Sequence, residues 1–212
     1  MGKVLYLECN SGISGDMTVG ALLDLGADRH VLEHALESLG VGGYHLHFGR
    51  KDVCGLDSYD FDVHLEEDGH EHDHPHSHED HHGHSHVHQH GDGHPLVHRN
   101  LFDIYQIIDK LESNDRVKEL ARRMFRIVAE AESKAHGLPV EQVHFHEVGA
   151  IDSIVDIISV AVCVDNLGVD DVVVSALAEG HGHVHCQHGV LPVPVPATAN
   201  IASAYGLDLR FT

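Results

Sequence analysis

The residue types best suited to binding a metal ion gather in the segment His144–Asp156, which reads HFHEVGAIDSIVD. Its first part carries two imidazoles and one carboxylate, from His144, His146 and Glu147. Nitrogen and oxygen donors mixed in this way suit a divalent transition metal ion. Residues 150–166 are almost entirely apolar, which predicts a buried helix. The segment therefore predicts metal ligands directly before a buried helix.

The same predicted helix carries a polar stripe on its apolar surface. The stripe has the spacing i, i+4, i+7 and i+11 and consists of Asp152, Asp156, Ser159 and Cys163. Two buried carboxylates one turn apart repel each other, so a metal ion, an arginine or a shared proton is expected between them. We predict that Asp152 and Asp156 belong to a catalytic or metal site. The alternative is that they cap neighbouring helices or pair with arginines.

A further set of donors lies in residues 180–189, which read GHGHVHCQHG. On a strand, residues two apart share a face, and this groups three imidazoles: His181, His183 and His185. Cys186 and His188 then lie near the other face, and we predict them as metal ligands. An exposed polar strand explains His181 and His183 equally well, so no role is assigned to the three alternating histidines.

Residues 66–94 contain 12 His and 8 acidic residues, no Lys or Arg, and a single aliphatic residue. Such a segment cannot bury enough apolar surface to offset its conformational entropy, so a disordered loop is predicted over residues 66–98. The imidazoles predicted as nickel ligands are His72, His74, His76, His78, His81, His82, His84, His86, His88 and His90. A flexible chain offers no rigid coordination shell, so we predict capture or storage of metal. A linker that binds metal incidentally is the alternative.

Between the first predicted strand and helix lies the segment CNSGISGDM, residues 9–17. Glycines and serines at such a turn expose backbone N–H groups at a helix N-terminus, where an anion can bind. The predicted ligand- or phosphate-binding residues are Ser11, Gly12, Ser14 and Gly15. The spacing fits neither a P-loop nor a dinucleotide-binding motif. Asp16 either caps the helix or joins Asp152 and Asp156 as a candidate catalytic residue.

The composition of the 212 residues excludes several classes of protein. The chain has 34 acidic and 13 basic residues, and the resulting formal net charge of −21 disfavours binding to nucleic acid. No apolar stretch reaches the roughly 18 residues of a membrane span, and no signal peptide is recognisable. The four Cys lack CxxC spacing and are read as reduced thiols. We expect a cytoplasmic homo-oligomer that binds neither nucleic acid nor membrane.

The hydrophobic periodicity predicts a mixed fold, α/β or α+β, in which helices flank a mixed sheet. Strands are predicted over residues 3–9, 43–50, 57–65, 171–176 and 180–188. Helices are predicted over residues 16–25, 29–39, 100–111, 115–136 and 150–166, with weak helical character in the last 15 or so. The His-rich loop divides one domain into an N-terminal segment, residues 1–65, and a segment that completes it, residues 99–212.

Three of these segments resemble the LarC family of nickel insertion proteins, which act in maturation of the lactate racemase cofactor. They are Ser-Gly-Ile-Ser-Gly-Asp-Met at 11–17, the His144–Asp156 run, and His-Gly-Val-Leu-Pro-Val-Pro-Val-Pro-Ala at 188–197. They occur in the family's order, with a His-rich insertion after the first, and span nearly the whole chain. Full-length members continue well past residue 212 into a domain associated with CTP binding, so we expect this chain to be truncated relative to them.

The resemblance implies a lyase-class, CTP-dependent cyclometallation that inserts nickel into a pyridinium mononucleotide carrying two thiocarboxylates. The product would hold nickel through one carbon and two sulfur atoms. Asp16, Asp152 or Asp156 would accept the ring proton, and the Gly/Ser loop would hold the phosphate. The implied partners are this mononucleotide, a C-terminal extension or partner chain, and the lactate racemase apoprotein. Nickel is the implied metal, while CTP and Mg or Mn are expected only with the C-terminal portion.

Two other functions fit the sequence. A nickel storage protein would act through residues 66–94 and would bind metal unchanged after mutation of Asp16, Asp152 and Asp156. A zinc- or manganese-dependent hydrolase would use Asp152 and Asp156 to cleave a phosphate or ester without any thiolated ligand.

Overall fold

The computed structural model describes residues 2–66, 99–145, 148–186 and 188–212. The predicted disordered loop with its ten histidine ligands lies outside these residues, as do His146 and Glu147. Within the described ranges, six α-helices and small sheets form a mixed α and β fold, which confirms the predicted class.

The six helices lie close to their predicted positions. They are α1 (Gly15–Asp24), α2 (Arg29–Glu37), α3 (Leu101–Lys110), α4 (Asp115–His136), α5 (Ile151–Asn166) and α6 (Pro196–Tyr205). Helix α4 has the predicted bounds because both ends are capped. The Asn114 side chain accepts a hydrogen bond from the Val117 amide, and Gly137 ends the helix at φ +66°.

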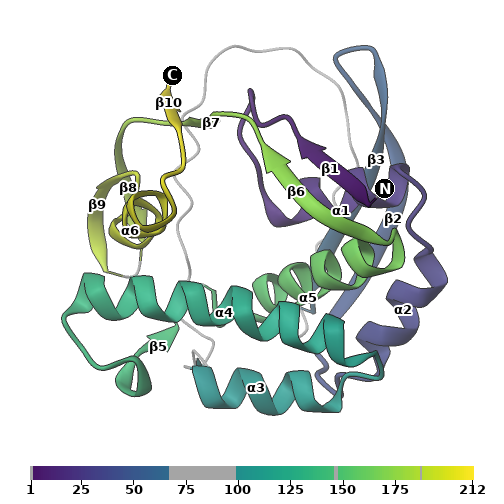
Figure 1. Cartoon of the computed structure of the whole chain (residues 1–212), viewed down its shortest axis with the longest axis horizontal. Coiled ribbons are helices and arrows are strands. Elements are labelled where there is room, and N and C mark those ends of the chain that lie inside the picture. Colours follow the sequence, from purple (N-terminus) through teal and green to yellow (C-terminus); the bar gives the residue numbers. More distant parts are fainter. Residues whose placement is uncertain (1, 67–98, 146–147, 187) are drawn as a thin grey trace.

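Helix α5 lies at the centre of the molecule, in contact with α1, α2 and α4 (Figure 1). Ile154, Val155 and Ile158 on α5 are almost completely buried, as is Phe125 on α4. A helix surrounded on several sides has few positions that tolerate polar residues. This explains the nearly continuous apolar sequence from Ile151 to Val164 and makes the polar residues on α5 conspicuous.

The strands of the described residues pair two by two in five small sheets instead of one mixed sheet. β1 (Lys3–Leu7) pairs in parallel with β6 (Val169–Val174), and β7 (Leu177–Glu179) pairs in parallel with β10 (Leu209–Phe211). The antiparallel pairs are β2 (Tyr44–Val53) with β3 (Leu56–Leu65), β4 (Arg99–Asn100) with β5 (His144–Phe145), and β8 (Gly182–Cys186) with β9 (Gly189–Val193).

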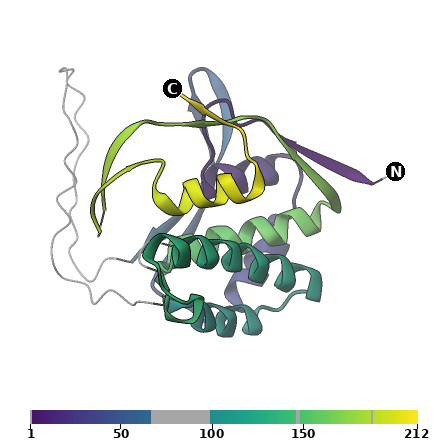
Figure 2. The same ribbon diagram turned by 60° about the vertical axis from the view of Figure 1, so that its left-hand side comes forward.

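Two of these pairs position the polar residues discussed below. Strand β3 of the long β2–β3 hairpin packs against α1 and α5 through the face on which Phe61 is buried, and Asp60 and Asp62 alternate with that face. The β8–β9 hairpin and α6 lie beside the C-terminal half of α4, as Figure 2 shows from another side. A strand predicted to continue to residue 188 instead ends at Cys186, because the chain reverses to β9 at Gly189, φ +94°. None of the helices in the described part of the chain combines the length and apolarity needed to cross a membrane.

Candidate functional site

The first turns of α1 and α5 meet in a cluster of carboxylates. Gly15 at the start of α1 lies so close to α5 that a Cβ atom there would overlap Oδ2 of Asp156. Only glycine permits this approach. The contact brings the predicted residues Asp16, Asp152 and Asp156 together, so that Asp16 and Asp152 both act electrostatically on Asp156. We call these three residues the carboxylate cluster.

Burial and neighbouring charge change the pKa of Asp156, one member of this cluster. Burial is the largest cause of a rise in the pKa of Asp156 from 3.8 to about 7, followed by the negative charges of Asp16, Asp152 and Asp62. Asp62 lies on β3 and was not predicted from the sequence to belong to the site. A carboxyl group with a pKa near neutrality can both accept and release a proton at physiological pH.

Helix α5 also carries buried polar atoms that lack hydrogen-bond partners. Asp152 Oδ1, Asp156 Oδ1 and Ser159 Oγ are buried and have no hydrogen-bond partner among the described residues. They follow the stripe expected from the sequence, whose fourth member, Cys163, is also buried. Leaving such atoms unpaired costs roughly 1–3 kcal/mol each. A stability cost of this size at one place is typical of sites retained for function.

The Gly/Ser loop leads directly into the carboxylate cluster. Ser14 is the N-cap of α1, since its Oγ accepts from the Met17 amide at 3.4 Å and donates to Asp16 Oδ1 at 2.5 Å. The capping residue is therefore Ser14 and not Asp16. Gly12 has φ +87° and donates its amide to the Cys9 carbonyl. The assignment of Ser11, Gly12, Ser14 and Gly15 to a phosphate stays a prediction, and a phosphate bound there would lie beside carboxylates.

A positive charge stands close to the cluster. Lys51 on β2 forms an ion pair with Asp60 on β3, and its pKa is raised mainly by that hydrogen bond, with smaller contributions from Asp60, Asp16 and Asp62. Strand alternation places Asp60 and Asp62 on the same face of the hairpin. The alternation of Asp60 and Asp62 along the strand is visible in the sequence, but the packing of the hairpin against α1 could not be predicted from it.

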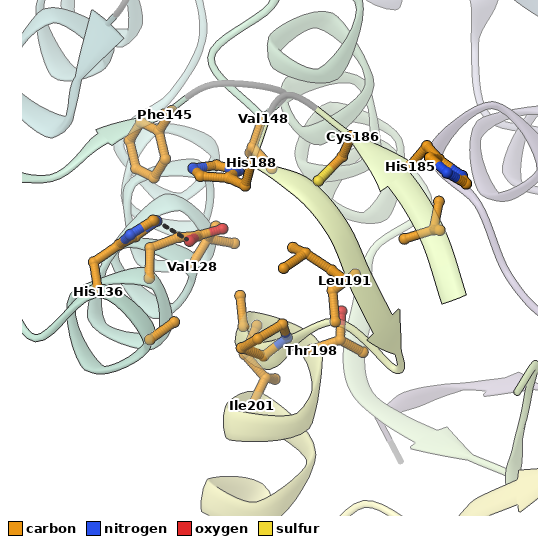
Figure 3. A pocket seen from close by; sticks show the side chains of 16 residues that line it. Val128, His136, Phe145, Val148, His185, Cys186, His188, Leu191, Thr198 and Ile201 are labelled. Carbon is orange, nitrogen blue, oxygen red and sulfur yellow. Dashed lines mark ion pairs between the residues drawn. The ribbon is translucent and has the colours of Figure 1, made fainter. Parts of the chain in front are cut away.

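A separate pocket of about 560 Å³ lies between the C-terminal half of α4, the β8–β9 hairpin and α6 (Figure 3). Most of its lining is apolar, with Val128, Phe145, Val148, Leu191 and Ile201 among the side chains. The predicted metal ligands Cys186 and His188 both line it. His144 is exposed on β5 and is not part of the lining, while its neighbour Phe145 is.

Three polar side chains, His136, His188 and Cys186, lie along one side of the pocket, which we call its polar wall (Figure 3). His136 and His188 stack at a tilt, with ring centroids 5.0 Å apart, and His136 Nε2 lies 3.4 Å from Glu132 Oε2 (Figure 3). The Cys186 thiol donates to the Gly189 carbonyl at 3.5 Å. The sequence analysis missed His136 and Glu132, although their i, i+4 spacing at the end of a helix was a weak signal.

The other histidines of this region lie elsewhere. His181 Nδ1 is 2.9 Å from the Thr212 carbonyl oxygen, and His183 is exposed outside the pocket. His185 belongs to the lining, but its ring points away from His136 and His188 in Figure 3. In the part of the chain that the structure describes, no three His, Cys, Asp or Glu side chains already converge as they would around a metal ion.

The pocket and the carboxylate cluster are close along the chain. Val148 lines the pocket, and Asp152 of the cluster follows four residues later. Four residues of chain span at most roughly 14 Å. The Cα atoms of Val148 and Asp152 therefore lie within that distance of each other.

Comparison with known proteins gives a consistent result. The family model described as "Nickel insertion protein" matches residues 5–209. A pyridinium-3,5-bisthiocarboxylic acid mononucleotide nickel insertion protein from Alkaliphilus metalliredigens is 57% identical over 213 residues, covering 100% of this chain and 48% of the relative. The Geobacillus kaustophilus protein of the same name is 42% identical, covering 94% of this chain and 44% of its own length. A putative nickel insertion protein from a Geobacter species is 43% identical, with 99% and 47% covered.

The chain thus spans about half the length of the curated relatives that it matches. No solved structure matches the chain.

Proposed function

The chain belongs to the nickel insertion protein family, and from this premise we propose that it takes part in inserting nickel into a pyridinium mononucleotide with two thiocarboxylate groups. The names of the relatives supply the substrate class, and nickel is the second substrate. The reaction forms a nickel–carbon bond at the ring carbon between the two thiocarboxylates. The C–H bond breaks, its electron pair forms the bond to nickel, and the proton must pass to a base.

The observation that carries the proposal is the carboxylate cluster. Its central member, Asp156, has a pKa raised to about 7, so near neutral pH it is part ionised and able to take up the ring proton. Asp16 and Asp152 increase its basicity through their negative charges. Asp156 is therefore the proposed proton acceptor, and Asp16 and Asp152 are proposed to tune it.

The apolar pocket is the proposed place for the aromatic ring. An apolar wall suits a flat ring, and Val128, Val148 and Leu191 contribute to it. Asp152, which acts electrostatically on the proposed proton acceptor Asp156, follows Val148 of the pocket lining by four residues, so we place the ring carbon on the side of the pocket nearest to Asp156. Breaking of the C–H bond is favoured where water is excluded, because charged groups then interact more strongly with one another.

The remaining partners are assigned by family resemblance. CTP and Mg²⁺ or Mn²⁺ are proposed to act with the portion of the relatives that this chain does not cover. Residues 66–98 are proposed to collect nickel, and the lactate racemase apoprotein is the proposed recipient of the product.

Mass spectrometry of the mononucleotide tests the proposal. The chain is incubated with Ni²⁺, the bisthiocarboxylated mononucleotide, CTP and Mg²⁺, with and without the uncovered portion of the Alkaliphilus relative. The expected product has gained one nickel in a form that resists chelators. Asp156→Asn should lower its yield at least 10²-fold, while Asp208→Asn, at an exposed carboxylate that follows the C-terminal end of α6, should not. Absence of product in both mixtures, while the complete relative forms it, would contradict the proposal.

A further inference from the structure

The polar wall of the pocket combines three donors of the kind that bind late transition metals. His136 comes from the last turn of α4, while Cys186 and His188 come from the β8–β9 hairpin. We propose that His136, His188 and Cys186 form a transition-metal site, in which Glu132 positions His136. Its identification with nickel rests on the proposed function, whereas binding of a metal ion there does not.

The separation of the two imidazoles fits a shared ion. A metal ion bound to an imidazole nitrogen at about 2.1 Å lies about 3.2 Å from the ring centroid. Two such rings at an angle of about 90–110° around the ion have centroids about 4.5–5.2 Å apart. The centroids of His136 and His188 are 5.0 Å apart, and the rings are tilted by 42°. The centroid spacing of the pair therefore lies within the range that two imidazole ligands of one ion require.

Glu132 has the placement of a residue that orients a metal-binding histidine. It lies one helical turn before His136, and its Oε2 is 3.4 Å from His136 Nε2. A carboxylate at one ring nitrogen fixes the ring, selects the tautomer and raises the basicity of the other nitrogen. Both side chains are partly shielded from solvent, with exposed fractions of 33% for His136 and 26% for Glu132, so solvent screens the contact only in part.

Cys186 supplies the third donor and must move to do so. Its thiol donates to the Gly189 carbonyl, and among the described residues no three donors converge on one point. Cys186 precedes His188 by two residues in the same tight hairpin, so their Cα atoms are at most roughly 7 Å apart. On binding, the thiol releases its proton to solvent, gives up the Gly189 carbonyl, and forms a metal–sulfur bond.

This arrangement suits the transfer of an ion rather than its storage. Two neighbouring imidazoles attract the ion, and a thiolate recruited on binding can leave again as other sulfur donors approach. A closed set of four fixed ligands would retain the ion instead. The surrounding Val128, Phe145 and Leu191 keep the wall apolar and limit competition from water.

Cobalt titration of the full chain tests the site directly. A Co²⁺–thiolate bond gives a near-ultraviolet charge-transfer band to which imidazole and carboxylate ligands, including those of residues 66–98, do not contribute. The expected result is a saturable band that is lost in Cys186→Ser and retained in Cys54→Ser, because Cys54 is exposed at the β2–β3 turn. Added Ni²⁺ should compete for the site and raise the Co²⁺ concentration at half-saturation of the band.

The roles of His136 and Glu132 are tested by measuring the Co²⁺ concentration at which the band reaches half of its maximum. His136→Ala should raise the Co²⁺ concentration at half-saturation at least 10-fold, and Glu132→Gln about 10-fold. His183→Ala, an exposed histidine of β8, should leave it unchanged. Thermal unfolding of each variant establishes that it is folded.

A band that persists in Cys186→Ser, or equal half-saturation for His136→Ala and His183→Ala, would overturn the proposal. The result of the cobalt titration can be distinguished from the result of the test of the proposed function. If the cobalt site forms as described but no nickel-containing mononucleotide is made, only the function is wrong. If the product forms but the band does not depend on Cys186 and His136, only the site is wrong.

Discussion

Substitution of Asp156 by Asn should make the chain more stable at alkaline pH. Burial and the charges around it raise the pKa of Asp156 from 3.8 to about 7. The folded state therefore binds the proton more tightly than the unfolded state does. Stability from this group is fully present below about pH 4 and is lost as the pH rises to about 7. The substituted amide side chain would remain neutral throughout, so the variant would avoid that loss.

The magnitude follows from the difference in pKa. The rise from 3.8 to about 7 corresponds to ~4 kcal/mol, at about 1.4 kcal/mol for each tenfold change in proton affinity. Because Asp156 is only partly buried, solvent screening reduces this to ~2 kcal/mol. We expect Asp156→Asn and the parent chain to be about equally stable near pH 4, and the variant to be more stable by ~2 kcal/mol near pH 8.

Urea denaturation in the presence of a chelator, at both pH values, measures this difference. Subtracting the parent chain from the variant removes the contribution of the many histidines, which titrate in both. Asp208→Asn serves as the control, because Asp208 is exposed and should give no pH-dependent difference. A gap between Asp156→Asn and the parent that is the same near pH 4 and pH 8 would refute the reasoning.

Three further outcomes test the packing around the site. Gly15→Ala should destabilise the chain by ~1–3 kcal/mol in urea denaturation, because the new Cβ would overlap a carboxylate, while Gly42→Ala has open space and should change it little. Burial raises the pKa of Cys163 to about 12, so a disulfide reagent at pH 8 should label Cys54 at once and Cys163 only after denaturation; rapid labelling of both would contradict its burial. Asn114→Ala should lower the free energy of unfolding by ~1–2 kcal/mol through loss of the α4 cap, and an unchanged value would mean that the cap is dispensable.

The course of the helices was predictable from local patterns. The predicted bounds of α4 agree with the structure, in which Asn114 caps its start and Gly137 its end, and both residue types are typical of those helix positions. The continuous apolar run correctly predicted a buried α5, and its periodicity placed Asp152 and Asp156 on one face. These features depend on neighbours within a few turns of the same chain segment.

The convergence of the sites was not predictable in the same way. The cluster depends on close contact between Gly15 and Asp156, which are far apart in sequence. The position of His136 at a helix end does not indicate that a later hairpin brings the His188 ring to a centroid distance of 5.0 Å. The short strand β10 was also missed, because three residues carry too little periodicity to be recognised.

The pH dependence of nickel–carbon bond formation tests the central claim most directly, that Asp156 accepts the ring proton. The measurement is a single-turnover rate of product formation, followed by mass spectrometry in the assay mixture that gives product. We expect a rate that rises with pH and levels off above about pH 7. In Asp156→Asn we expect the rate to fall at least 10²-fold and this pH profile to be lost. An Asp156→Asn chain that keeps the rate and the pH profile of the parent would contradict it.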